Sequence, residues 1–219
     1  EYAVVLALPI SQILNASYKQ QCLPSIWKIA NVSALPKVKL VQDLKRELRS
    51  ISLTPSISKV AEDFVVKDYV KPAILKKIDP NQYGTIPKSS TISALLSMIH
   101  NWTSGLDGTG STITVILLDY QEAFDLIDHR ILVNKLLQID LPRSIINWII
   151  HFLSDRYQRV KLPQRCYSEW GRVPSGVPQG TKLGTQLFLI MINDLSLTDT
   201  DLWKYVDDTT ASETVNKSQ

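Results

Sequence analysis

The chain has 219 residues, of which 44% are hydrophobic, and it carries a formal net charge of +3. These values describe a globular protein of one domain or two closely packed subdomains with a sizeable core. The two cysteines, Cys22 and Cys166, are too few and too far apart for a zinc site or a disulfide framework, which fits an intracellular protein. No apolar run approaches the length that spans a membrane.

The charge is distributed unevenly along the chain. Residues 1–112 carry 13 Lys and Arg against 8 Asp and Glu, a net +5, whereas residues 113–219 carry 11 against 13, a net −2. A basic first half suits contact with nucleic acid, and a slightly acidic second half suits a gathering of carboxylates. Two ordinary solvated surfaces explain the same numbers equally well.

Apolar periodicity predicts helices and strands that follow one another along the chain. The expected elements before residue 112 are a strand over 27–35, a helix over 57–77 that Pro72 ends or kinks, a turn over 79–84 and a helix over 91–102. Those after it are an apolar, buried strand over 113–118, helices over 129–139, 144–153 and 187–195, and a strand over 157–162 with Arg156, Arg159 and Lys161 exposed.

The segment 202–211 reads as a tight hairpin. Two short β-prone runs, 202–206 and 209–211, flank the pair Asp207 and Asp208, which we expect at the tip of the turn. Adjacent anions repel each other, and a divalent metal would remove that cost. An acidic pair in a turn is more often simply solvated.

A second carboxylate changes this balance. The apolar strand over 113–118 runs directly into Asp119, and so delivers a charge to one edge of a sheet. If that strand lies beside the hairpin, Asp119 and Asp207 converge on one point. Such an arrangement holds two Mg²⁺ ions for in-line phosphoryl transfer.

Three segments in this order resemble a known family. Tyr205-Val206-Asp207-Asp208 is similar to the Tyr-x-Asp-Asp signature of reverse transcriptases. The segments 118–125 and 175–180 resemble the first and second palm motifs of non-LTR retrotransposon enzymes of the jockey type. Residues 27–37 and 47–84 resemble the fingers region of the same family, so the resemblance covers nearly the whole chain.

This resemblance implies an α+β right-hand polymerase fold, with fingers in residues 1–112, the palm in residues 113–219, and the thumb missing. The implied function is RNA-directed DNA polymerase activity, in which a primer 3′-hydroxyl attacks the α-phosphate of a deoxynucleoside triphosphate with two Mg²⁺ ions, or Mn²⁺ as a substitute. The implied partners are an RNA template, a DNA primer and the rest of a longer retroelement polyprotein. The start at Glu1 and the end eleven residues after Asp208 also indicate a piece of a longer reading frame.

The resemblance also assigns site residues. Asp119, Asp207 and Asp208 are the expected catalytic residues and metal ligands, with Asp208 completing the acidic cluster. The expected substrate-binding residues are Lys37, Arg49, Phe124 as a steric gate against the ribose 2′-hydroxyl, Gln179 against the template, Gly180 beside the nucleotide, and Tyr205. Without the resemblance, Lys37 reads as a solvated lysine and Phe124 as a core aromatic residue.

Two other interpretations stay open. A catalytically inactive remnant that keeps the palm fold and at most binds nucleic acid is suggested by departures from the family pattern at Leu48, Ser50, Thr85 and Thr185. An RNA-dependent RNA polymerase has a similar acidic turn, but Phe124 and Tyr205 disfavour it because the gate would exclude ribonucleotides.

Overall fold

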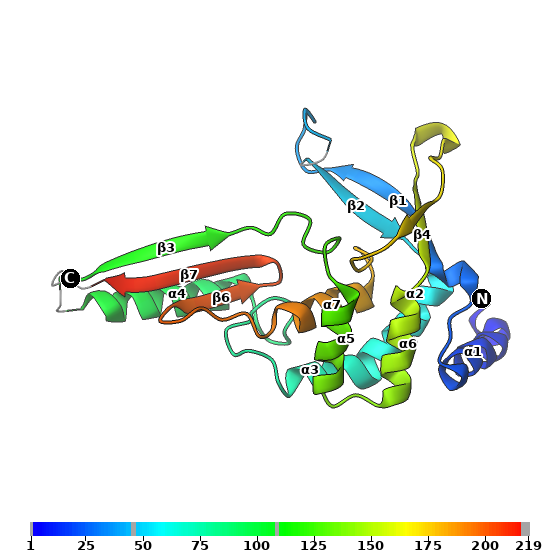
Figure 1. Ribbon diagram of the computed structural model, residues 1–219, viewed down its shortest axis with the longest axis horizontal. Helices are drawn as coiled ribbons and strands as arrows, with labels where there is room; N and C mark the ends of the chain where they lie inside the picture. The colour runs from blue at the N-terminus through cyan, green and yellow to red at the C-terminus, as the bar shows by residue number, and fades with distance from the viewer. Residues whose placement is uncertain (1, 45–46, 108–109, 216–219) are drawn as a thin grey trace. The chain divides into compact units, whose positions relative to one another are not determined.

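In a computed structural model the chain divides into two compact units (Figure 1). The first consists of Glu1–Ile74 and Phe124–Met191, and the second consists of Leu75–Ala123 and Ile192–Gln219. The structure describes residues 2–44, 47–107 and 110–215. The assignment of residues 1–112 to fingers and of residues 113–219 to a palm is functional rather than geometric, and it stays a prediction.

Helices form the core of the first unit. They are α1 (Ala3–Gln20), α2 (Ser56–Val65), α3 (Lys71–Leu75), α5 (His129–Gln138), α6 (Arg143–Leu153) and α7 (Lys182–Ile192). The predicted helix over 144–153 is confirmed as α6, whose Trp148, Ile149 and Phe152 are fully buried. Trp148 also donates from Nε1 to the Ser17 hydroxyl of α1 at 3.0 Å, so its polar edge is satisfied inside the core.

A mixed four-stranded sheet belongs to the same unit, in the order β2-β1-β4-β5. Its strands are β1 (Ile29–Pro36), β2 (Leu48–Leu53), β4 (Arg156–Val160) and β5 (Gly171–Val173). β1 pairs antiparallel with β2 and parallel with β4, and β4 pairs antiparallel with β5. The predicted strands over 27–35 and 157–162 are confirmed as β1 and β4.

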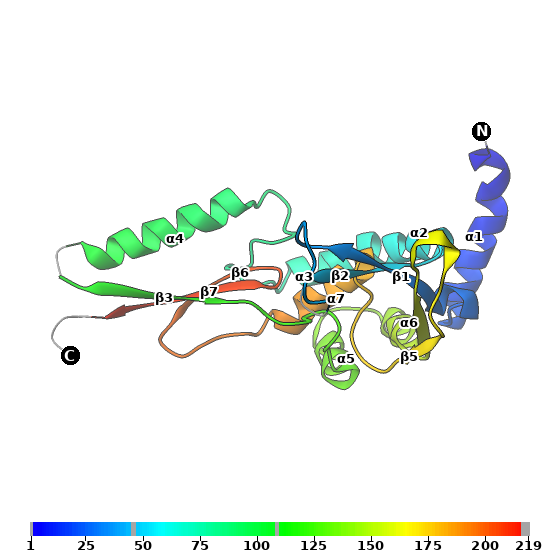
Figure 2. The same ribbon diagram turned by 90° about the horizontal axis from the view of Figure 1, so that it is seen from above.

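The second unit is a three-stranded antiparallel sheet with one long helix against it. The strands are β3 (Thr112–Leu118), β6 (Asp201–Tyr205) and β7 (Asp208–Val215), in the order β3-β7-β6. Helix α4 (Thr91–Leu106) lies along one face of this sheet (Figure 2). Its contact depends on tryptophans, because Trp102 donates to the Ser212 hydroxyl and Trp203 donates to the Ser97 hydroxyl, both at 3.0 Å.

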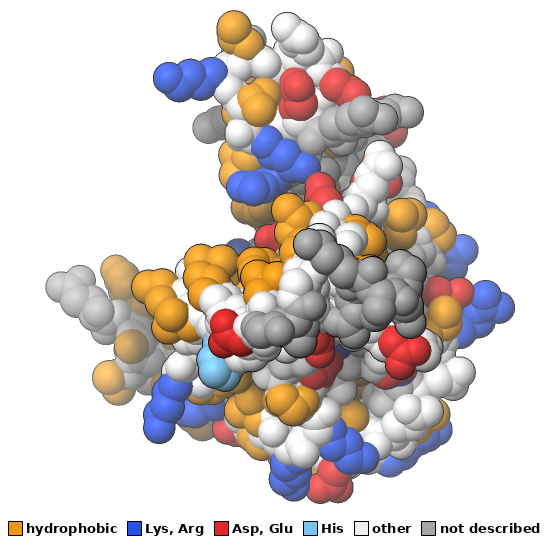
Figure 3. All heavy atoms as spheres, turned by 90° about the vertical axis from the view of Figure 1, so that its left-hand side faces the viewer, with side chains coloured by type: hydrophobic (Ala, Val, Ile, Leu, Met, Phe, Trp, Pro, Cys, Tyr) orange, Lys and Arg blue, Asp and Glu red, His pale blue; other side chains and the backbone are white. Residues whose placement is uncertain are grey.

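The structure corrects two expectations about burial. β3 was expected to be buried, but it is an edge strand whose Ile116 and Leu117 are 55% and 77% exposed. Hydrophobic side chains gather at the surface that Figure 3 shows. Arg156 was expected to be exposed, but it is buried, because its guanidinium lies over the Phe152 ring and donates to the Phe152 carbonyl at 2.9 Å.

The expectation that Pro72 ends or kinks its helix also needs correction. Residues Val66–Val70 form a π-helical segment between α2 and α3, and α3 continues through Pro72. Proline lacks an N–H and its ring crowds the carbonyl four residues earlier. The wider turn before it relieves that crowding, so the chain stays helical. Among the described residues, none of the helices is both long and apolar enough to span a lipid bilayer.

A buried carboxyl group lies in the core of the first unit. Glu62 is fully buried, and desolvation raises its pKa to about 7, although the Leu183 N–H, the charge of Arg156 and the Ser58 hydroxyl act in the opposite direction. The folded chain therefore holds a proton on Glu62 more tightly than the unfolded chain does, for which the usual pKa is 4.5. The resulting stabilisation is complete at acidic pH and is lost as the pH rises toward 7.

We expect the stability difference between the wild type and Glu62→Gln to depend on pH. From about pH 4 to about pH 8, the wild type should lose about 3 kcal/mol of unfolding free energy relative to the variant, since one pKa unit corresponds to about 1.4 kcal/mol. Urea unfolding of both proteins at several pH values measures this, and the variant cancels the titration of all other groups. A difference that stays constant with pH would contradict the assignment.

Candidate active site

The hairpin of the second unit presents the acidic pair, in a register that differs from the expectation by one residue. β6 ends at Tyr205, which pairs with Asp208, so the two-residue turn consists of Val206 and Asp207. Asp208 is the first residue of β7 and was wrongly expected at the tip of the turn. The difference matters because it places Asp208, rather than Asp207, in the ladder that leads to β3.

The backbone of this turn is strained. Val206 has φ +59°, in the left-handed region that β-branched residues rarely adopt. Such a conformation persists only where neighbouring contacts hold it. The turn that carries Asp207 is therefore shaped by its surroundings and not by the preference of its own residues.

Strand pairing brings the third carboxylate to the same place. The ladder between β3 and β7 ends with Leu118 opposite Thr209, so the next positions along it are Asp119 and Asp208. Directly opposite residues of an antiparallel pair have their Cβ atoms about 5 Å apart. Desolvation, then the charges of Asp207 and Asp119, raise the pKa of Asp208. The predicted convergence of Asp119 with the acidic pair therefore agrees with the register and with the electrostatics.

The carboxylate oxygens of Asp119, Asp207 and Asp208 are of the ligand type that Mg²⁺ prefers. Within residues 2–44, 47–107 and 110–215, no three or more His, Cys, Asp or Glu side chains form a group that could hold a metal ion by itself. Mg²⁺ in phosphoryl-transfer sites is bound through one or two carboxylates together with waters and substrate phosphates, so a complete protein cage is not required. A cation would also offset the charges of Asp207 and Asp119, which raise the pKa of Asp208 in addition to its desolvation.

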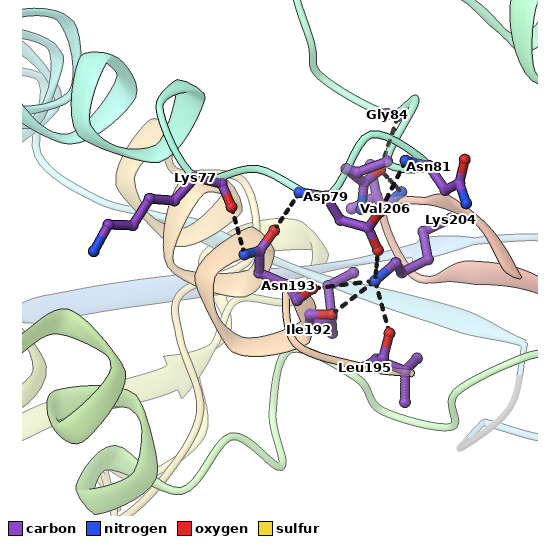
Figure 4. Close-up of polar contacts among 10 residues, drawn as sticks. Lys77, Asp79, Asn81, Gly84, Ile192, Asn193, Leu195, Lys204 and Val206 are labelled. Carbon is purple, nitrogen blue, oxygen red and sulfur yellow. Dashed lines mark hydrogen bonds and ion pairs between the residues drawn. The ribbon is translucent and has the colours of Figure 1, made fainter. Parts of the chain in front are cut away.

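A buried lysine anchors the strand that leads into the turn (Figure 4). The Lys204 side chain is 0% exposed, and its Nζ forms an ion pair with Asp79 Oδ2 at 2.5 Å. The same Nζ donates to the carbonyls of Asn193 at 3.2 Å and Leu195 at 2.9 Å. Asn193 in turn accepts from the Asp79 N–H at 2.9 Å, which closes the network. Charge and carbonyl dipoles thus compensate the desolvated ammonium.

The remaining expected site residues, apart from Tyr205, lie in the first unit. The Gln179 carbonyl accepts from the Ser52 N–H at 2.9 Å, and Gly180 has φ +92°, which only glycine adopts readily. Phe124 is half-buried and stacks on Phe188 with ring centroids 4.7 Å apart. The contacts of Gln179 and Gly180 are compatible with a loop that approaches template and nucleotide closely. The stacking of Phe124 on Phe188 is what a packing residue would also show.

The expected basic residues lie on neighbouring strands of the first unit. Arg49 is exposed on β2 and pairs in register with Leu35 of β1. Lys37 is exposed just beyond β1, where its N–H donates to the Glu47 carbonyl at 2.7 Å. Tyr205, at the end of β6 in the second unit, is half-buried beside the turn. The register of β3 with β7 thus leads Asp119 toward the acidic turn and Tyr205, while the metal-ligand and substrate-binding assignments stay predictions.

Two residues of this site were missed by the sequence analysis. Lys204 lies between apolar residues of a strand, and a charged residue at such a position signals a buried partner. Gln82 stands in a segment that was expected as a turn and that resembles the family, but no contact was assigned to it; its side chain contacts the acidic turn.

We expect Lys204→Met to lower the unfolding free energy by about 3 kcal/mol, because removal of one partner of a buried ion pair leaves the other uncompensated. Denaturant unfolding measures the loss. Lys161→Met, at an exposed lysine of the first unit, is the matched control and should stay within about 0.5 kcal/mol of the wild type. Equal stabilities of the two variants would show that the Lys204 network contributes nothing beyond packing.

A matching family model and two curated relatives of this chain are described as RNA-dependent or RNA-directed DNA polymerases. The family described as "Reverse transcriptase (RNA-dependent DNA polymerase)" matches residues 35–217. The "Probable RNA-directed DNA polymerase from transposon X-element" of Drosophila melanogaster is 29% identical over 208 residues, covering 92% of this chain and 23% of that protein. The "RNA-directed DNA polymerase from mobile element jockey" of the same species is 25% identical over 191 residues, covering 87% of this chain and 20% of that protein. The chain thus spans about a fifth to a quarter of the length of these relatives.

Solved structures show the same fold. Apo telomerase from Candida tropicalis, truncated from its C-terminal domain, superposes with a TM-score of 0.59 at 15% identity and covers 96% of this chain and 49% of that chain. Telomerase from Candida albicans in complex with a TWJ fragment of telomeric RNA gives a TM-score of 0.60 at 13% identity, covering 91% and 40%. The expected α+β polymerase fold is confirmed by this likeness.

Proposed function

The chain belongs to the reverse transcriptase (RNA-dependent DNA polymerase) family, and from that membership we propose that it carries the nucleotidyl-transfer centre of an RNA-directed DNA polymerase. The substrates are a DNA primer on an RNA template and deoxynucleoside triphosphates. The observation that supports this most strongly is the register of β3 with β7, which leads Asp119 toward the turn of Asp207 and Asp208; desolvation, followed by the charges of Asp207 and Asp119, raises the pKa of Asp208 there.

Each carboxylate has a role in this proposal. Asp119 and Asp207 would hold two Mg²⁺ ions, and Asp208 would complete the anionic cluster. Such ions would supply activation of the primer 3′-hydroxyl and neutralisation of charge on the phosphates. The protein supplies a turn of fixed geometry, so that its carboxylates need little rearrangement when the metals and the triphosphate arrive.

The substrate contacts belong to the same proposal. Arg49 offers the triphosphate a planar fork of donors, and Lys37 adds a second positive charge. Gln179 and Gly180 form a close-approach loop for the template base and the nucleotide, Phe124 excludes a ribose 2′-hydroxyl, and Tyr205 lies against the substrate. In this proposal the chain is part of a longer retroelement polyprotein and acts inside the cell.

We expect Asp119→Asn and Asp207→Asn each to reduce Mg²⁺-dependent extension of a DNA primer on an RNA template by at least about 10³-fold, the size of losing a preorganised electrostatic contact. Both variants should keep the unfolding free energy of the wild type within about 1 kcal/mol, since the aspartates repel one another when no metal is present. Glu213→Gln, an exposed carboxylate further along β7, is the matched control and should extend normally. Extension by either aspartate variant at the wild-type rate would refute the assignment, and a wild type that fails to extend would favour the inactive remnant.

A further inference from the structure

The turn at 79–84 packs against the strand that leads into the acidic turn. Gln82 forms a parallel bridge with Lys204 of β6. On either side of it, the Lys204 N–H donates to the Asn81 carbonyl and the Tyr83 N–H donates to the Lys204 carbonyl, both at 2.8 Å. The turn therefore forms an isolated bridge to the β6 edge of the three-stranded sheet, immediately before Tyr205.

The side chain of Gln82 extends this contact into the acidic turn itself. It is 4% exposed, and its Oε1 accepts from the Val206 N–H at 3.2 Å and from the Gly84 N–H at 2.9 Å. Val206 is the turn residue with φ +59°, directly before Asp207. A buried backbone N–H without an acceptor carries a substantial free-energy cost. By accepting from the Val206 N–H, Gln82 stabilises the strained conformation of that residue.

Gly84 permits this arrangement. A Cβ on Gly84 would lie 2.6 Å from both the Cγ2 and the backbone N of Val206, and 3.0 Å from the Tyr205 carbonyl carbon. No side chain fits there without displacing the acidic turn. The backbone of Gly84 thus approaches the turn more closely than any other residue would allow.

The turn at 79–84 is itself held in place by the Lys204 network. Asp79 pairs with the Lys204 ammonium, and the Asn193 side chain joins the Asp79 N–H to the Lys77 carbonyl (Figure 4). All of these contacts lie in the second unit. Gln82 is therefore a fixed acceptor rather than a flexible side chain that follows the acidic turn.

We propose that Gln82 is a positioning residue for Asp207. By accepting from Val206 and Gly84 at once, it holds the left-handed backbone of Val206 and so sets the direction in which the Asp207 carboxylate leaves the turn. Gln82 does not touch substrate in this role and acts through the backbone. The inference rests on the proposed polymerase function for its catalytic consequence, but the contact itself is testable without activity.

The test compares Gln82→Met, which keeps the length of the side chain and removes the acceptor, with the wild type. Trp102→Phe is the matched control, because it removes a hydrogen bond to Ser212 in the same unit without touching the acidic turn. Hydrogen exchange of the Val206 amide is read first, on the full chain without metal. We expect Gln82→Met to speed this exchange about tenfold relative to Trp102→Phe, the effect of losing one hydrogen bond.

Steady-state extension with increasing deoxynucleotide is read second. Gln82→Met should lower kcat about tenfold or more with KM changed less than about twofold, because a misdirected ligand affects the transition state more than substrate binding. Trp102→Phe should keep the wild-type kcat. Unchanged Val206 exchange in Gln82→Met overturns the proposal, as does a kcat equal to that of Trp102→Phe. If the wild type extends no primer, the proposed function fails, and the exchange of the Val206 amide alone decides the role of Gln82.

Discussion

The Lys204 ammonium is withdrawn from water and surrounded by the Asp79 carboxylate and the backbone carbonyls of Ile192, Asn193 and Leu195. An uncompensated charge in such a place would cost several kcal/mol, so all of these groups must stay in register for the second unit to be stable. This single requirement joins three segments that are far apart in sequence: the turn at 79–84, the segment 192–195 and strand β6. The acidic turn begins directly after Tyr205, two residues beyond Lys204, so the same contacts hold it in place.

Rigidity is useful here because the site gathers like charges. Antiparallel pairing of β3 with β7 leads Asp119 toward Asp208, and the turn adds Asp207. Desolvation raises the pKa of Asp208, and the charges of Asp207 and Asp119 raise it further. A flexible loop would separate the carboxylates, whereas a hairpin with a held backbone keeps them together and ready for cations. The strained backbone of Val206 and the buried acceptor of Gln82 thus act together to hold the acidic turn.

Much of this arrangement could be predicted from the sequence. Apolar periodicity located β3, α4, α5 and α6, and the approach of Asp119 to the hairpin follows from a strand that ends in a carboxylate. The register of the turn could not be derived, because Val206 adopts a backbone conformation that its side chain disfavours and only the contacts of Gln82 and Gly84 explain. The burial of Lys204 and Arg156 could not be predicted either, since each side chain is compensated by partners that are distant in sequence. The exposure of β3 was missed because local pattern does not show whether a strand lies at an edge.

The central claim is that Asp119, Asp207 and Asp208 share one electrostatic field at the end of the second unit's sheet. Carboxyl ¹³C NMR titration of Asp208 in the wild type and in Asp119→Asn tests this most directly, because it needs neither metal nor substrate. The account predicts a pKa above the ordinary aspartate range in the wild type, and a lower pKa in the variant, where one neighbouring negative charge is removed. A pKa of Asp208 that is the same in both proteins would contradict the account, since Asp119 would then lie too far away to share a metal with the acidic turn.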